Sequence, residues 1–104
     1  MPKIIEYFGI ILRFFSREHE PIHVHAFFGE ECQVKVSFII LEGVIEEIIY
    51  ENVAGYEPFP PGKIKDLDIL IDKYKYTIVN AWIKYFVLNE KIQTITITKK
   101  LSKK

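Results

Sequence analysis

The amino-acid sequence predicts an α+β fold: an antiparallel sheet of about four to five strands with one long or two short helices packed on one face. Three observations predict it. Apolar and polar residues alternate through the first half, apolar residues recur every three or four positions after Pro61, and alternation returns near the end. With 104 residues, 49% of them hydrophobic, the chain is expected to form a single domain, residues 1–104.

Four strands are expected in the first half, at residues 7–15, 22–28, 32–40 and 44–50. Charged residues and Pro21 separate the first two, and glycine-containing turns at 29–31 and 41–43 separate the others. Because side chains alternate along a strand, His23, His25 and Phe27 are expected on one face and Val24, Ala26 and Phe28 on the other. In the third strand the alternation predicts a buried face with Val34, Val36 and Phe38 and a wet face with Gln33, Lys35 and Ser37.

A helix is expected from residue 63 to about 88, after a loop rich in proline and glycine at 51–62. Its apolar stripe comprises Ile64, Leu67, Leu70, Ile71, Tyr74, Ile78, Trp82, Tyr85 and Phe86. The β-branched run at 76–79 allows a break into two helices. The alternation in residues 91–98 predicts a last strand, at the sheet edge or paired with another copy of the chain.

The composition predicts a soluble cytoplasmic protein, and its net charge gives no indication of nucleic-acid binding. Fourteen basic and fourteen acidic residues cancel, so no overall field attracts nucleic acid. The single cysteine, Cys32, fits a reducing compartment, and the apolar N-terminal segment is too short and too often interrupted by charges to span a membrane. Four lysines among the last six residues are expected to form a solvated tail.

All three histidines fall between residues 19 and 25. His23 and His25, two apart on a strand, share a face with Cα atoms about 7 Å apart. With His19 as a third ligand and Glu30 as a carboxylate, they form a candidate site for a divalent transition metal. The same three histidines are candidate acid–base groups near neutral pH. The structural alternative places His23 and His25 on the wet face of the sheet, with His19 bracing the turn at Pro21.

The segment from Tyr7 to Glu30 resembles the signature of a family of short bacterial proteins catalogued as domain of unknown function 4160. The matching residues are Phe8, Gly9, Ile10, His19, Pro21, His23, His25, Ala26, Phe28, Gly29 and Glu30. Ile22 and Val24 depart from the family pattern, which has proline and phenylalanine there. The resemblance implies a small cytoplasmic bacterial protein, often encoded beside another small protein, an arrangement that suggests a toxin–antitoxin pair.

Two functions are therefore expected. The first is a partner-binding module of a two-gene, toxin–antitoxin-like system, which uses the His19–His25 segment as its functional surface and a small protein encoded by an adjacent gene as its partner. The second is a metal-dependent or histidine-based hydrolase, with RNA as a candidate substrate. A homodimer is also expected, because an uncovered strand at a sheet edge is commonly covered by self-pairing.

Overall fold

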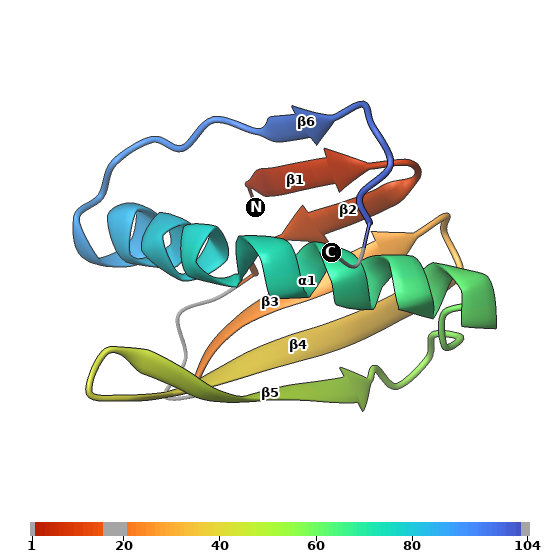
Figure 1. Ribbon diagram of the computed structural model, residues 1–104, viewed down its shortest axis with the longest axis horizontal. Helices are drawn as coiled ribbons and strands as arrows, with labels where there is room; N and C mark the ends of the chain where they lie inside the picture. The colour runs from red at the N-terminus through yellow and green to blue at the C-terminus, as the bar shows by residue number, and fades with distance from the viewer. Residues whose placement is uncertain (1, 16–20, 103–104) are drawn as a thin grey trace.

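The computed structural model describes residues 2–15 and 21–102. Within them the chain forms a sheet with one long helix on one face and a short π-helical turn after the helix (Figure 1). The elements in chain order are β1 (Lys3–Tyr7), β2 (Ile10–Arg13), β3 (Ile22–Phe28), β4 (Cys32–Leu41), β5 (Val44–Asn52), α1 (Pro61–Trp82), η1 (Ile83–Val87) and β6 (Ile95–Ile97).

The sheet has six strands in the order β5-β4-β3-β2-β1-β6, so the α+β class is confirmed and the strand number is corrected. Strands β1 to β5 form an antiparallel meander, as short connections favour. The last strand, β6, pairs parallel to β1, which makes the sheet mixed rather than purely antiparallel. Because α1 and the segment after it carry the chain back across the sheet, β6 can run beside β1 in the same direction (Figure 1).

The expected first strand at 7–15 is wrong, because this segment turns at Phe8 and Gly9. Both residues have a positive φ, 44° and 88°, as a two-residue hairpin turn requires. The turn creates β1 and β2 from what the sequence presents as one apolar run. The same kind of turn, at Glu42 and Gly43, joins β4 to β5 where a turn was expected.

The core lies between the sheet and α1. The sheet contributes Ile5, Tyr7, Ile10, Leu12, Val24, Ala26, Val34, Val36 and Phe38, and the helix contributes Leu67, Leu70, Ile71, Ile78 and Val79. The expected apolar stripe and its packing on one sheet face are thereby confirmed. Full burial of a leucine such as Leu67 stabilises the fold by about 1.5–3 kcal/mol.

The helix does not break at residues 76–79. Ile78 and Val79 are buried in the core, and this packing outweighs the weak helix propensity of β-branched residues. The helix changes instead at η1, where the Leu88 N–H donates to the Ile83 carbonyl at 3.1 Å, a π-helical bond.

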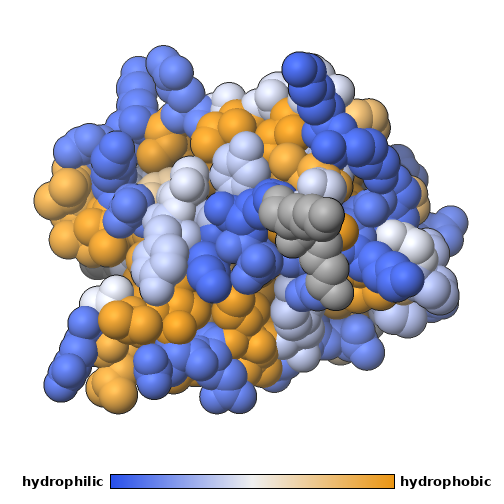
Figure 2. Space-filling view, viewed as in Figure 1, coloured by the Kyte–Doolittle hydropathy of each residue, from blue (hydrophilic) through white to orange (hydrophobic). Residues whose placement is uncertain are grey.

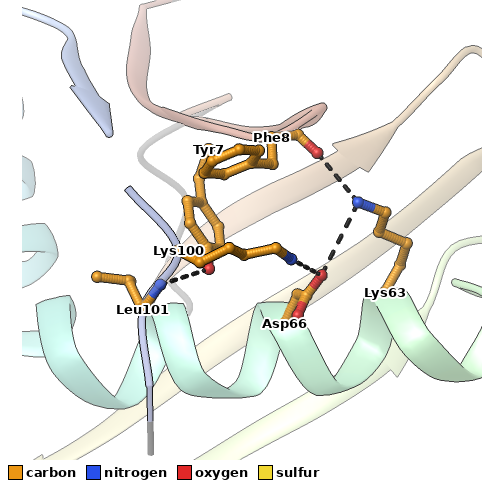
Figure 3. A network of polar contacts seen from close by, with 6 residues as sticks. All are labelled: Tyr7, Phe8, Lys63, Asp66, Lys100 and Leu101. Atoms are coloured by element: carbon orange, nitrogen blue, oxygen red, sulfur yellow. Dashed lines mark hydrogen bonds and ion pairs between the residues drawn. The ribbon is translucent and has the colours of Figure 1, made fainter. Parts of the chain in front are cut away.

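Contacts at residues 100 and 101 tie the described end of the chain to the rest of the fold (Figure 3), and Lys103 and Lys104 of the expected tail lie outside the described residues. The Lys100 ammonium donates to Asp66 on α1 at 2.8 Å, and this hydrogen bond raises the pKa of Lys100. Lys63 approaches the same carboxylate at 3.8 Å. One residue later, the Leu101 N–H donates to the Tyr7 hydroxyl at 2.9 Å. The strand expected at 91–98 is correspondingly reduced to Ile95–Ile97, and the residues after it follow these contacts across the helix.

Candidate binding surface on the open face of the sheet

The sheet has a second face that points away from α1, and no helix among the described residues packs on it. We call it the open face, and its central residues are Ile11, Arg13, His23, His25, Phe27, Gln33, Lys35 and Ser37. The expected alternation of β3 is confirmed, since Val24 and Ala26 are in the core and His23 and His25 point the other way.

Strand register places three basic side chains in one row across the open face. His25 of β3 lies opposite Arg13 of β2 on one side and Lys35 of β4 on the other. Glu51 of β5 extends this row at the sheet edge, opposite Lys35. Directly opposite residues have Cβ atoms about 5 Å apart, so Arg13 and Lys35 place cationic side chains on either side of the His25 imidazole.

The His23 side chain is held by a hydrogen bond to the residue just before β3. Its Nδ1–H donates to the Pro21 carbonyl at 3.0 Å, and only 4% of the residue is exposed. Its ring meets the His25 ring edge-on, with ring centroids 5.5 Å apart.

His25 is oriented by two contacts. Its Nδ1–H donates to the Gln33 side-chain oxygen at 2.7 Å, and its ring stacks on Phe15 with centroids 4.5 Å apart. The hydrogen bond satisfies an amide that is 97% buried, since Gln33 is 3% exposed. This arrangement fixes both the ring plane and the tautomer of His25.

Gln33 and Ser37 were expected to be wet and are buried instead, at 3% and 5% exposed. Both residues lie on the sheet face that was predicted for them, but that face is not exposed to solvent at their positions. The register places Gln33 opposite Phe27 and Ser37 opposite His23, so ring side chains lie beside both polar groups. Gln33 is the residue of the candidate site that the sequence interpretation missed, and the aromatic residues on the second face of β3 were a signal of its burial.

The structure brings together one pair of the expected site residues. His23 and His25 are in contact, whereas Glu30 lies in the exposed turn beyond the far end of β3. His19 lies outside the described residues. In residues 2–15 and 21–102, no group of three histidine, cysteine, aspartate or glutamate side chains is arranged to hold a metal ion.

The two imidazoles have a geometry that suits either recognition or ligation. Donation from Nδ1 leaves Nε2 as the acceptor nitrogen of the neutral ring. Metal-binding histidines commonly donate their other ring nitrogen to a carbonyl in this way. Two rings on one zinc-like ion would place their centroids about 5 Å apart, and the observed 5.5 Å is close to that spacing.

In the described part of the chain, no helix has the length and hydropathy needed to cross a bilayer. No curated protein and no solved structure matches this chain. Residues 9–83 match a family described as "Domain of unknown function (DUF4160)". The matched range runs from the turn before β2 through α1 and contains the open face of β2 to β5. Because the match covers well over half of the sequence, the chain belongs to the DUF4160 family.

Proposed function

We propose that this chain is a partner-binding module that contacts another protein through its open face, centred on the partly exposed His25. The partner is the small protein encoded by an adjacent gene, in a two-gene, toxin–antitoxin-like system. One observation carries the proposal: α1 covers one face of the sheet, while the other presents basic and aromatic side chains anchored by partly buried hydrogen bonds.

The open face is suited to binding because its central side chains are already ordered. The bond to Gln33 and the stacking of Phe15 hold His25 in one orientation, so less side-chain entropy is lost on association. Phe15 itself is 38% exposed, and its ring packs on that of Phe27 with the ring centroids 5.8 Å apart. An aromatic residue beside an arginine is the composition typical of interface hot spots.

The charges define the chemistry of the partner surface. Arg13 and Lys35 are cationic side chains on either side of His25, so we expect an acidic group on the partner, flanked by apolar residues that contact Phe15. Glu51 at the sheet edge would repel that acidic group if the partner shifted toward β5, and this sets the orientation of docking.

The test is co-expression of the untagged chain with its tagged genomic neighbour, followed by co-purification and a mass measurement by light scattering. A mixed complex supports the proposal, whereas a homodimer alone, or failure to co-purify, contradicts it. Lys35→Glu should weaken the complex at least tenfold, because it reverses a charge in the basic row. Lys84→Glu on η1 is the matched control, with the same charge change in the helical layer, and should leave the complex intact.

A second candidate function is a metal-dependent or histidine-based hydrolase, with RNA as the substrate class. The specific support is the anchored Nδ1 atom of each imidazole and their 5.5 Å centroid separation. In this proposal His23 and His25 bind a divalent transition metal or exchange protons, and His19 assists.

Metal titration of the untagged protein separates the two functions. His23→Asn and His25→Asn each retain a donor near the Nδ1 position and remove the atom equivalent to Nε2, so the hydrogen bonds of the open face are preserved. Tight stoichiometric binding that both substitutions abolish would favour the metal-dependent hydrolase. RNA cleavage that is unchanged in both variants would exclude the histidines as its catalytic groups.

A further inference from the structure

A pocket of about 420 Å³ opens between β5 and the first half of α1, on the side of the sheet opposite the open face. We call it the Tyr50 pocket. Val34, Phe59 and Ile64 provide apolar walls, and the polar lining consists of Tyr50, Asn52, Lys65 and Asp68. Hydrophobic atoms are visible between the helix and β5 in the space-filling view (Figure 2). The volume lies within the range of small-molecule sites, about 300–1,000 Å³.

The loop that closes the pocket is pinned to the sheet. The Gln33 N–H donates to the Glu57 carbonyl at 3.2 Å, and the Glu57 N–H donates to the Glu31 carbonyl at 2.8 Å. Pro58 and Pro60 restrict the backbone on either side of Phe59, which is itself buried. The pocket is therefore preformed, and a ligand would not have to order its wall.

One carboxylate at the pocket, that of the solvent-exposed Asp68, has no cation of its own among the described residues. Asp68 accepts a hydrogen bond from the Tyr50 hydroxyl at 3.1 Å, and among the described residues it forms no ion pair. Lys65 also lines the pocket but does not pair with it. One turn further along the helix, Asp72 pairs with Lys75. Burial, and then the negative charge of Asp68, raise the pKa of Tyr50, so the phenol stays protonated and neutral.

We propose that the Tyr50 pocket binds a small organic cation, a primary amine attached to an aromatic or branched apolar group. The ammonium would donate to the Asp68 carboxylate and the Tyr50 oxygen, and the apolar group would contact Val34, Phe59 and Ile64. The ammonium would supply the positive countercharge for the Asp68 carboxylate, and the apolar group would displace water from the apolar walls of the pocket. This site is independent of the open face and of the function proposed for it.

The test uses three ligands that share one ring: phenethylamine, 2-phenylethanol and 3-phenylpropionate. Each is titrated into ¹⁵N-labelled protein while the amide shifts of Val34, Phe59 and Ile64 are followed. The amine should bind saturably, at least tenfold tighter than the alcohol, and the acid should bind weakest. No saturation by the amine up to about 20 mM, a ligand concentration beyond the millimolar range of weak specific binding, would overturn the proposal. Binding of the acid as tight as that of the amine would overturn it as well.

Matched variants assign the charge. Asp68→Asn should weaken amine binding at least tenfold and leave alcohol binding nearly unchanged. Tyr50→Phe should weaken amine binding severalfold, because it removes one acceptor and keeps the ring. Asp72→Asn is the control, with the same charge change on the same helix, and should alter affinity less than twofold. Equal losses in the Asp68 and Asp72 variants would indicate general electrostatic attraction and contradict the assigned site.

Discussion

Replacing Gly9 by alanine tests the hairpin that joins β1 to β2. Gly9 has a φ of +88°, and a Cβ built there would lie 3.1 Å from Cε1 of Phe28. The left-handed backbone alone costs an L-residue about 1–2 kcal/mol. Phe28 contacts Phe59 at 6.1 Å between centroids and lies under the Lys63 ammonium at 5.0 Å, so its ring is confined when the new methyl group approaches. Overpacking of this kind adds about 1–3 kcal/mol, which gives an expected loss of roughly 2–5 kcal/mol in total.

Gly43→Ala is the matched control for the backbone term. Gly43 has a φ of +81° in the equivalent turn between β4 and β5, and nothing lies within 4 Å of its added Cβ. The free energy of unfolding of Gly43→Ala should therefore fall only by the cost of the left-handed backbone, about 1–2 kcal/mol. Urea unfolding of both variants gives the difference, and Gly9→Ala in a Phe28→Leu background should lose most of the excess. Equal losses at Gly9 and Gly43 would refute the contact with Phe28.

Three further outcomes are expected. His25→Ala should lower the free energy of unfolding by about 1–3 kcal/mol more than His25→Asn, because only alanine leaves the buried Gln33 oxygen without a donor; urea unfolding measures this, and equal losses would contradict it. Because the pKa of Tyr50 is raised in the folded protein, its contribution to the free energy of unfolding should be fully present below pH 10, the ordinary tyrosine pKa, and should decline at higher pH. The decline should be less than about 1.4 kcal/mol per pH unit because the ring is partly exposed. Tyr50→Phe should flatten the profile of unfolding free energy above pH 10, and a profile identical to that of the wild type would count against the raised pKa. Tyr7→Phe should lower the free energy of unfolding by about 1 kcal/mol and speed hydrogen exchange at the Leu101 amide. An unchanged exchange rate would mean that the other contacts alone hold this segment.

The strands that alternate cleanly could be predicted from sequence. The ranges expected for β3 and β4 agree with the structure to within one residue, because each strand has one face against the helix, which imposes a period of two. The sequence of β5 does not alternate, and its start was predicted from the glycine turn that precedes it. The first hairpin is different. Ile4 and Ile5 are both buried where β1 shifts register against β2, which removes the alternation that would have shown a separate strand. Gly9 was the remaining sign of a turn within this apolar run.

Some features of the candidate site could likewise be predicted from the sequence, and others could not. The common face of His23 and His25 follows from strand geometry and could be predicted. The burial of Gln33 could not, because it depends on neighbours that strand pairing supplies from elsewhere in the sequence. The contact between Tyr50 and Asp68 likewise depends on how α1 docks beside β5, and no local pattern encodes that distance.

One residue of β4 connects the two proposed surfaces. The Gln33 side chain accepts the His25 hydrogen bond on the open face, while its backbone N–H donates to Glu57 in the loop that closes the Tyr50 pocket. The next residue, Val34, points to the opposite side and lines that pocket. Because successive residues of a strand face opposite sides, this short segment carries a recognition surface on one face and a cavity wall on the other. Only the contact on the open face depends on the glutamine side chain, because any residue except proline would supply the backbone N–H that donates to Glu57.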